Sequence, residues 1–484
     1  MNTVATERTR LYIGGGWHKP HDPAMTEIIS PATEQTFGAA PTGGPADVDA
    51  AVAAARLALH AGPWAGSNGT DRAAWMRALA VELAARGDRT AAVVSGENGM
   101  PITLARNAEG QGPAATLRYY ADLAERTPPE ERRPAAQPGR VTVVRRDPIG
   151  VVAAVVPWNF PQSLTMFKLA PALAAGCTVV LKPAPETALD AFALADAAEA
   201  CGIPPGVINV ITGGRDVGAH LVAHPGVDKV AFTGSTAAGR AIGEVCGRLL
   251  RPVTLELGGK SAAIVLDDAD LEQTVRGLSW ASLLNNGQTC YLSSRILAPR
   301  SRYAEVVAAV ADLAGSLKVG DPMDPSTRVG PLVTSAQRDR VEGFIAAGRR
   351  EGGRVVTGGG RPAGLPVGWY VEPTVFVDLA PEATPVRDEI FGPVLCVLPY
   401  DDIEDAVRLA NDSDYGLGGT VWTRDVERGL EIARRVETGS IGVNFFDLDL
   451  GAPFGGVKAS GLGRELGPEG LNAYVSVKSI YLRS

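Results

Sequence analysis

The chain has 484 residues, of which 45% are hydrophobic and 21% charged, a balance typical of a globular protein with about two or three domains. Its formal net charge of −8, without a dense Lys/Arg cluster, argues against a nucleic-acid partner. Five cysteines stand singly, without CxxC spacing, which argues against a disulfide framework or a thiolate zinc site and suits a reducing compartment.

The first ten residues, MNTVATERTR, contain no apolar signal segment, and the apolar run over 151–156 is far too short to span a membrane. We therefore expect a cytoplasmic protein without membrane contact. Ala-rich stretches with helical spacing over 47–59 and 70–83 predict that the beginning of the chain is helical.

Residues 128–138, PPEERRPAAQP, are rich in proline and charge and predict a surface connection. They lead into RVTVVRRDP, in which apolar and polar residues alternate as in a strand, and this strand would belong to a projecting hairpin arm. The closing segment NAYVSVKSIYLRS is also strand-like. We expect it to pair either with this arm or with another subunit.

From residue 150 onward, apolar runs alternate with Ala-rich helical stretches, and Gly176 and Gly202 follow two of these helices. The runs are GVVAAVV, TVVLKP, GVINVI, DKVAFTG and VTLEL. They are apolar throughout, which is typical of parallel strands covered by helices on both faces. A second series after residue 260, with SAAIVL, SRILAP, VEPTVFVDL, PVLCVLPY and GTVWT and a helical segment over 403–410, predicts a second α/β domain.

Cys290 differs from the other four cysteines because it lies in a polar, glycine-containing context, NNGQTCY. Such a context leaves the thiol partly exposed and backbone amides free to donate. The other cysteines lie in apolar text, where a free cysteine is a small buried hydrophobic residue. Cys290 is thus the candidate nucleophile. The five histidines show no HExxH-like grouping, so no metal is expected.

Four polar residues are expected at the carboxyl edge of the parallel sheet, where α/β proteins bind ligands. They are Asn159 in PWNFP, Lys182 in TVVLKP, Ser235 in FTGSTAAG and Glu256 in VTLEL. The Asn159 amide can donate to an oxyanion, and a desolvated Glu256 would have the raised pKa of a general base. Free amides at the helix start near Ser235 would attract phosphate. Each residue alone also fits an ordinary turn or surface position, so the prediction rests on their convergence.

The motifs PWNFP, LKPAPET, FTGSTAAG, LELGGKS, NNGQTC and DEIFGPV, in this order, resemble the aldehyde dehydrogenase superfamily nearly end to end. Glu256 precedes Cys290 by 34 positions, as the family's general base precedes its nucleophile. The resemblance implies an α/β fold with three parts. These are a Rossmann-type NAD(P)-binding domain over 1–127 and 149–258, a catalytic domain over 259–460, and a small β oligomerisation arm over 128–148 and 471–484.

The resemblance further implies NAD(P)-dependent oxidation of a small-molecule aldehyde to its acid. Cys290 would attack the aldehyde to give a thiohemiacetal, with the oxyanion held by the Asn159 amide and the Cys290 backbone N–H. After hydride transfer, Glu256 would activate the water that hydrolyses the thioacyl enzyme. Lys168 matches a lysine that supports Asn159 and the relay, and Glu465 in SGLGRELG matches a second carboxylate implicated in proton relay.

For the cofactor, the resemblance places Glu389 at the nicotinamide ribose, Phe391 against the ring and Lys182 at the adenosine ribose. The other expected contacts are Pro157, Trp158, Ala184, Pro185, Phe232, Gly234, Ser235 and Leu257. Pro185 stands where many NAD-preferring members carry a glutamate, and Glu186 stands beside it. NAD is therefore expected, with NADP as the alternative.

The resemblance also places the aldehyde in a largely apolar tunnel that contains no arginine. The residues expected to line it, with the loop 445–450, are Phe160, Leu164, Phe167, Thr289, Tyr291, Leu450 and Phe454. A semialdehyde carboxylate would need a bidentate arginine, so we predict an aliphatic, terpenoid or aromatic aldehyde. Asp447 and Asp449 leave a cationic aminoaldehyde as an alternative.

Two rival functions stay open at this point. In the acylating branch of the superfamily, coenzyme A takes the acyl group and no general base is needed, so Glu256 argues against it. A binding or structural protein that kept the fold without its chemistry is the second rival, and the presence of Cys290, Glu256 and Asn159 argues against that. The arm and the terminal strand predict a homodimer or a homotetramer.

Overall fold

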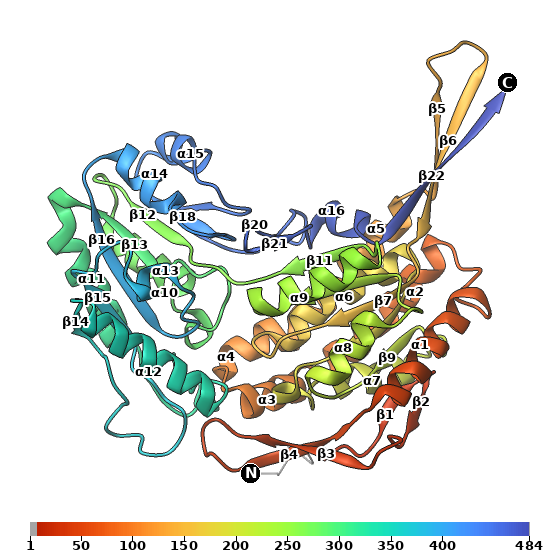
Figure 1. Ribbon diagram of the computed structural model, residues 1–484, viewed down its shortest axis with the longest axis horizontal. Coiled ribbons are helices and arrows are strands. Elements are labelled where there is room, and N and C mark those ends of the chain that lie inside the picture. The colour runs from red at the N-terminus through yellow and green to blue at the C-terminus, as the bar shows by residue number, and fades with distance from the viewer. Residues whose placement is uncertain (1–6, 484) are drawn as a thin grey trace.

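The apolar runs after residue 150 form the parallel centre of an eight-stranded sheet in the computed structural model, which describes residues 7–483 (Figure 1). The sheet order is β2-β1-β9-β8-β7-β10-β11-β21. Because β8 and β9 extend the sheet on one side of β7 whereas β10 and β11 extend it on the other, the β7–β10 boundary is a switch point, where ligand crevices form. The bounds are β7 Val151–Val155, β8 Thr178–Lys182, β9 Ile208–Val210, β10 Lys229–Thr233, β11 Val253–Glu256 and β21 Gly461–Leu462.

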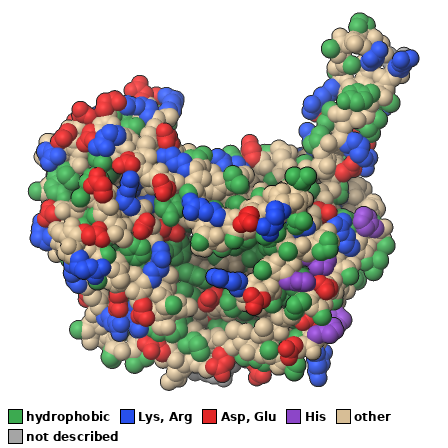
Figure 2. Space-filling view, viewed as in Figure 1, with side chains coloured by type: hydrophobic (Ala, Val, Ile, Leu, Met, Phe, Trp, Pro, Cys, Tyr) green, Lys and Arg blue, Asp and Glu red, His purple; other side chains and the backbone are tan. Residues whose placement is uncertain are grey.

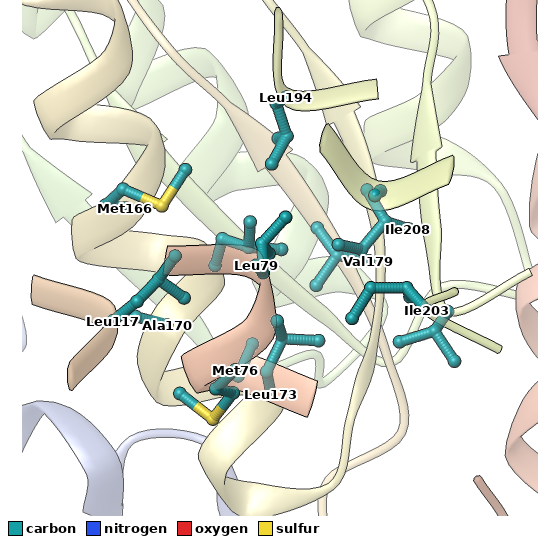
Figure 3. Packing of buried hydrophobic residues seen from close by; sticks show 14 of the residues in the cluster. Met76, Leu79, Leu117, Met166, Ala170, Leu173, Val179, Leu194, Ile203 and Ile208 are labelled. Atoms are coloured by element: carbon teal, nitrogen blue, oxygen red, sulfur yellow. The ribbon is translucent and has the colours of Figure 1, made fainter. Parts of the chain in front are cut away.

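Helices cover both faces of this sheet, as the uniformly apolar strands predict. Alternate side chains of β7 point to opposite faces, so that Val152 packs against one helix layer and Val151 against the other. Figure 3 shows part of this layer, where Met76, Leu79 and Met166 belong to one buried cluster with Val179 of the sheet. The first layer consists of α2 Gly69–Ala85, α5 Gly112–Arg126, α6 Pro161–Ala175 and α7 Ala191–Ala200, and the second of α1 Pro45–His60, α8 Arg215–Ala223 and α9 Thr236–Arg248.

The second series of apolar runs forms a seven-stranded sheet, in the order β14-β15-β16-β13-β12-β18-β19. All neighbours are parallel except β14 and β15. One face carries α10 Leu271–Ala281 and α11 Tyr303–Ser316, and the other α12 Ser335–Arg350, α14 Ile403–Asn411 and α15 Val426–Ala433. The strands are β12 Ala262–Val265, β13 Arg295–Pro299, β14 Arg354–Thr357, β15 Thr374–Val377, β16 Val394–Tyr400, β18 Gly419–Trp422 and β19 Gly442–Val443.

A three-stranded antiparallel arm projects from the molecule (Figure 1). Its strands are β5 Glu130–Pro134, β6 Arg140–Pro148 and β22 Val475–Arg483, in the order β22-β6-β5. The expectation of a mere connection over 128–138 is thus wrong for 130–134, where charged residues form an exposed edge strand because edges tolerate charge and proline. The terminal strand pairs with the arm itself, in register from Val475 opposite Pro148 to Arg483 opposite Arg140.

The beginning of the described chain is not simply helical. Four short strands precede α1, and two of them, β1 and β2, extend the first sheet. Their three-residue length is too short to give a periodic signal, and β1 is held by antiparallel pairing with β9. The strands are β1 Leu11–Ile13, β2 Gly16–His18, β3 Ala24–Ile29 and β4 Thr36–Thr42, and α3 Gly87–Asn98 and α4 Ile102–Ala105 follow α2.

A six-residue π-helical segment, Arg106–Gln111, joins α4 to α5. The smaller elements of the C-terminal half are α13 Thr384–Arg387, β17 Tyr415–Gly416, β20 Val457–Lys458 and α16 Gly467–Asn472. Among residues 7–483, no helix has both the length and the apolar character needed to cross a membrane. On the face shown in Figure 2, acidic and basic side chains are interspersed over the surface.

Candidate functional site

The loop that carries Cys290 is held in an unusual backbone conformation by its own polar residues. Asn285, Asn286 and Gly287 have φ values of 49°, 60° and 74°, in the left-handed region that asparagine and glycine tolerate best. The Asn286 amide donates to the carbonyls of Gly99 (3.0 Å) and Pro331 (2.9 Å). The motif NNGQTC therefore serves to fix the loop, and the fixed loop presents the thiol.

The Cys290 backbone lies against the glycine pair that follows β11. A methyl group on Gly259 would come within 2.3 Å of the Cys290 carbonyl oxygen, so only glycine permits this approach. Burial raises the pKa of the Cys290 thiol, and the nearby carboxyl groups of Glu389 and Glu256 raise it further. The resting nucleophile is consequently a thiol, which must lose its proton to a base before or during attack.

Asn159 lies beside this loop, at the end of β7 and just before α6. Its side-chain amide donates to the Gln288 carbonyl (3.0 Å), and its own carbonyl accepts from the Asn285 amide (2.9 Å). Asn98 donates to the neighbouring Trp158 carbonyl (3.0 Å). An amide group carries two N–H donors, so Asn159 has one left for an oxyanion formed at Cys290.

Glu256 is buried at the end of β11, 2% exposed, behind the wall of the site. Among the described residues neither of its carboxyl oxygens has a hydrogen-bond partner, and Oε1 lies where a methyl group on Gly455 would come within 2.6 Å. Burial raises the pKa of Glu256 well above its usual value, and the Glu465 carboxyl raises it further. The raised pKa that the sequence predicts for a general base is thus present, with desolvation as its main cause.

Lys168 and Glu465 form a buried ion pair at 2.8 Å, with side chains 0% and 1% exposed. Lys168 also donates to the Thr233 hydroxyl (2.6 Å) and to the Leu164 carbonyl (3.4 Å). It therefore contacts the carboxylate expected to relay protons, and its hydrogen bonds go to that group and to Thr233 rather than to Asn159.

Two cavities meet at Cys290 and Asn159, which line both. The larger has a volume of about 580 Å³ and largely apolar walls. Of the predicted substrate residues, it is lined by Phe160, Leu164, Phe167, Thr289, Tyr291 and Phe454. Leu450 does not line it, because this side chain packs behind the wall with Leu164, Phe167 and Phe454, and Leu448 of the same loop reaches the cavity instead.

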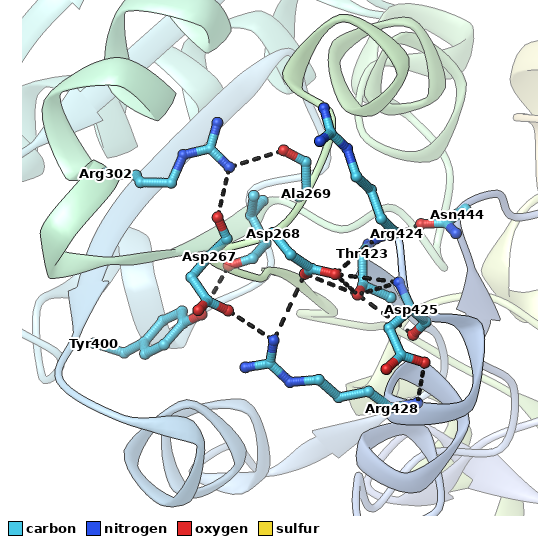
Figure 4. Close-up of polar contacts among 11 residues, drawn as sticks. Asp267, Asp268, Ala269, Arg302, Tyr400, Thr423, Arg424, Asp425, Arg428 and Asn444 are labelled. Atoms are coloured by element: carbon cyan, nitrogen blue, oxygen red, sulfur yellow. Dashed lines mark hydrogen bonds and ion pairs between the residues drawn. The ribbon is translucent and has the colours of Figure 1, made fainter.

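Aromatic rings define the end of the larger cavity near Cys290. Tyr291 stacks on Phe446, with ring centroids 4.8 Å apart, and meets Phe454 edge-on at 6.3 Å. The loop that supplies Phe446 is held by Asn444, whose side chain accepts a hydrogen bond from the Thr423 backbone (2.8 Å). Thr423 belongs to a network of acidic and basic residues (Figure 4). The aromatic wall is therefore set by contacts outside the cavity.

The smaller cavity, about 290 Å³, opens at the switch point between β7 and β10. Seven of the predicted cofactor residues line it: Pro157, Trp158, Gly234, Ser235, Leu257, Glu389 and Phe391. Ser235 caps α9 by accepting from the Ala238 backbone, and Glu389 accepts from the Gly259 backbone (2.9 Å). Burial raises the pKa of Glu389 to about 7.

Four predicted cofactor residues, Lys182, Ala184, Pro185 and Phe232, do not line this cavity. Lys182 ends β8 at the same sheet edge, where its ammonium group donates to the Pro183 carbonyl (2.8 Å). Phe232 packs beneath Gly234, at which a methyl group would come within 2.5 Å of the ring. These residues extend the sheet edge beyond the cavity without entering it.

Several residues that line the two cavities are not predicted from the sequence. Gln337 and Arg340 of α12 reach the smaller cavity from the second sheet, and the Arg340 guanidinium donates to the Glu389 carbonyl (2.5 Å). On the larger cavity the unforeseen residues are Leu104, Asn107, Ala108, Ser163, Gly277, Trp280 and Leu284. They belong to helices and short segments whose pattern indicates only an amphipathic surface, so no local signal singles them out.

Comparison with known proteins agrees with this geometry. The sequence model of the aldehyde dehydrogenase family matches residues 17–480. The chain is 52% identical to geranial dehydrogenase of Castellaniella defragrans over 479 residues, covering 99% of this chain and all of that protein. It is 46% identical to an aldehyde dehydrogenase of Mycobacterium tuberculosis solved with NAD+, with a TM-score of 0.96 and 99% of each chain covered.

A third similar protein is aldehyde dehydrogenase C of Pseudomonas syringae, of which a variant was solved with NAD+ and octanal. It is 39% identical to this chain with a TM-score of 0.94, over 98% of this chain and 96% of that one. Sequence, fold and site thus agree along nearly the whole length. The chain therefore belongs to the aldehyde dehydrogenase family of NAD(P)-dependent enzymes.

Proposed function

We propose that this chain oxidises apolar aldehydes, terpenoid aldehydes above all, to carboxylic acids with NAD+. The observation that carries this proposal is the larger cavity, whose lining is mainly aromatic and aliphatic and contains neither arginine nor lysine. An apolar aldehyde would be desolvated there at little cost, whereas a carboxylate would find no cation to pair with. The similarity to a geranial dehydrogenase and to an enzyme solved with octanal supports the same class.

In the first step the Cys290 sulfur bonds to the aldehyde carbon, and the carbonyl π electrons move to oxygen. The resulting oxyanion accepts hydrogen bonds from the free Asn159 amide N–H and from the Cys290 backbone N–H. The thiol proton passes to Glu256 once the Glu256 side chain has turned toward Cys290, and the raised pKa of Glu256 suits it to hold that proton. Formation of the thioester then requires loss of hydride from the same carbon.

Before the second step Glu256 must release the thiol proton, so that it is again a carboxylate. It then takes a proton from the water that attacks the thioester carbon, and the Cys290 sulfur leaves as a thiolate as the C–S bond breaks. Because Glu256 lines neither cavity, its side chain must rotate from the Gly455 backbone toward Cys290 to act. The buried pair of Lys168 and Glu465 lies behind it and provides ionisable groups to which the proton can pass.

The residues of the smaller cavity fit a dinucleotide. The amides at the start of α9, near Gly234 and Ser235, suit a pyrophosphate, and the Glu389 carboxylate suits the ribose hydroxyls. Gly258 admits this carboxylate, since a methyl group there would come within 2.5 Å of Glu389 Oε2. Phe391 and Trp158, edge to face at 5.3 Å, would border the nicotinamide. NAD+, when bound, supplies the hydride acceptor.

NAD is proposed as the preferred cofactor, with NADP as the alternative. Three residues after Lys182, at the outer end of the sheet edge, the chain has Pro185 and not a carboxylate that would repel a 2′-phosphate. Burial lowers the pKa of Lys182 to about 8, even though the nearby Glu186 carboxyl acts to raise it. The negative charge of Glu186 beside the expected ribose position favours the unphosphorylated cofactor.

A substrate panel tests the proposed function. NADH and NADPH formation would be measured with propanal, octanal, geranial, betaine aldehyde and succinic semialdehyde. We expect the highest kcat/KM with geranial or octanal and NAD+. A higher kcat/KM for either charged aldehyde would contradict the apolar assignment, and acyl-CoA formation in the presence of coenzyme A would favour the acylating rival.

We also propose a cytoplasmic homo-oligomer, a dimer or a tetramer. The arm offers an edge strand, β22, with exposed apolar side chains at Val477, Tyr481 and Leu482. Apolar side chains on a projecting strand suit burial against a second copy of the chain. The five free cysteines suit a reducing compartment. Light scattering of the purified protein would give the mass of the assembly.

A further inference from the structure

Helix α6 starts directly after the loop that carries Asn159, and its first turn lacks a local cap. Phe160, the capping position, provides no side-chain hydrogen bond, and Pro161 follows it. The next backbone N–H groups, those of Gln162 and Ser163, therefore need an acceptor from elsewhere. A buried helix start without one would cost stability and would loosen the loop before it.

The acceptor is Glu109, from the π-helical segment Arg106–Gln111. Its Oε2 accepts from the Gln162 backbone N–H at 2.7 Å and more weakly from that of Ser163 at 3.4 Å. Glu109 is 1% exposed, and burial raises its pKa to about 8, although the hydrogen bonds from the Gln162 and Ser163 backbones act to lower it. The partial positive charge of the helix start favours the carboxylate form above that pH. A side chain more than 50 residues away in sequence thus caps α6.

The same π-helical segment forms part of the tunnel wall. Asn107 and Ala108 line the larger cavity, and the Ala108 carbonyl accepts from the Ser163 hydroxyl at 2.7 Å. A π turn adds one residue to the helical turn, and such turns are often found at functional sites. In this segment Ala108 lines the cavity, and the carboxyl group of the adjacent Glu109 contacts the first turn of α6.

On its other side the Asn159 loop is held by Asn98, which donates to the Trp158 carbonyl. Asn98 ends α3 next to Glu97, whose carboxyl accepts from the Leu189 and Asp190 backbones. Asp190 in turn accepts a hydrogen bond from the side chain of Gln162 (2.6 Å), which lies in the first turn of α6. The oxyanion loop is therefore enclosed by a ring of buried polar contacts.

We propose that Glu109 is a positioning residue for the oxyanion-binding amide of Asn159. By fixing the first turn of α6, Glu109 fixes the direction in which the preceding loop presents this amide to the carbon attacked by Cys290. Misplacement of a preorganised donor lowers the rate of every reaction that uses it. The effect should thus be independent of aldehyde size and should extend to ester hydrolysis at Cys290.

The test is Glu109→Gln at pH 9, where wild-type Glu109, whose pKa is raised to about 8, is mainly a carboxylate. The neutral amide oxygen of the variant holds the two N–H groups less strongly than this carboxylate. We expect kcat to fall about fivefold to tenfold, by the same factor for propanal and octanal, with little change in KM. Hydrolysis of 4-nitrophenyl acetate, which needs no cofactor, should fall equally. Asp402→Asn, which neutralises a carboxylate capping α14 at the surface, is the matched control and should keep both rates.

A double-mutant cycle decides whether Asn159 mediates the effect. In Asn159→Ala protein, measured by single-turnover NADH formation, adding Glu109→Gln should cause no further loss, because the amide to be positioned is absent. An additive loss would overturn the proposal, as would wild-type kcat in Glu109→Gln. A loss confined to octanal through KM would assign Glu109 to the tunnel wall, and failure of Glu109→Gln to fold would assign it to stability.

Discussion

The two cavities that meet at Cys290 are built from different parts of the chain. The smaller is lined largely by residues at and just beyond the ends of the first sheet's strands, such as Thr233, Gly234, Leu257 and Gly258. The larger is bounded by side chains from helices and loops that are far apart in sequence, such as Leu104, Trp280 and Phe446. The first cavity therefore depends on how strands pair, whereas the second depends on how separate helices and loops pack.

This difference separates chemistry from specificity. Cys290 and Asn159 are held by backbone geometry and buried hydrogen bonds that any aldehyde would meet in the same arrangement. The aromatic wall contacts only the remote part of the substrate. Changes to Cys290 or Asn159, where the two cavities meet, should accordingly affect all aldehydes alike. Changes elsewhere in the larger cavity should discriminate between aldehydes.

The largest effect is expected for Cys290→Ala. Loss of the sulfur nucleophile removes the covalent pathway, so aldehyde oxidation and ester hydrolysis should both fall by at least about 10⁴-fold. Rates with propanal and octanal, measured as NADH formation, would show the same loss. Cys201→Ala, which removes a partly buried thiol at the end of α7, serves as the control. Substantial turnover by Cys290→Ala would refute the proposed mechanism.

Glu256→Gln should have the next largest effect. It should allow NADH formation but slow the hydrolysis of the thioester. Without a base to activate water, the thioester should accumulate and steady-state turnover should fall by about 10²- to 10³-fold. Rapid mixing should show a burst of NADH approaching one equivalent per active site, again for both short and long aldehydes. A burst of normal size followed by normal turnover would show that another group activates the water.

The pH profile follows from the same two residues. Burial raises the pKa values of both Cys290 and Glu256, and their reactive forms are the deprotonated thiolate and carboxylate. Activity should therefore rise with pH, and kcat/KM should be low near pH 4.5, the ordinary pKa of a glutamate. A profile already at its plateau at that pH would show that neither pKa is raised in the free enzyme.

The polar residues at the carboxyl edge of the first sheet can be predicted from the strand pattern for a physical reason. Asn159 and Ser235 follow β7 and β10, Glu256 ends β11, and the parallel pairing of these three easily recognised apolar strands brings their ends together. Because parallel strands pair side by side, residues that are far apart in sequence but each close to a strand end meet at one edge of the sheet. The placement of Lys182 at the same edge follows likewise, although its side chain bonds its neighbour rather than entering the cavity.

No comparable rule predicts which residues line the larger cavity. Whether Leu448 or Leu450 reaches the cavity depends on the path of an irregular loop, which is set by distant contacts such as that of Asn444 with Thr423. Likewise, the π turn that brings Asn107 to the wall depends on the tertiary contact of Glu109 with α6. Local sequence periodicity contains neither contact, so it predicts neither Asn107 nor which leucine of the loop 445–450 reaches the cavity.

Phe446→Ala sharpens the contrast, because it alters only the larger cavity. Removing this ring takes away the stacked partner of Tyr291 and leaves part of the substrate without contact. We expect KM for octanal and geranial to rise about tenfold, while kcat and the constants for propanal change little. Steady-state kinetics with the three aldehydes measure this. An equal loss for propanal would mean that the aromatic wall also positions the reacting groups.

Asp447→Asn should have the smallest effect with apolar substrates and the most informative one with cations. Asp447 lines the larger cavity, where its carboxylate accepts from the Leu448 backbone, and the lining contains no lysine or arginine to pair with it. If apolar aldehydes are the substrates, neutralising this charge should change kcat/KM for octanal by less than about threefold. A fall of tenfold or more with betaine aldehyde alone, from a wild-type value near that for octanal, would show that the carboxylate recognises a cationic head group. The specificity of the second cavity would then rest on one charge at its rim, and not on the aromatic wall.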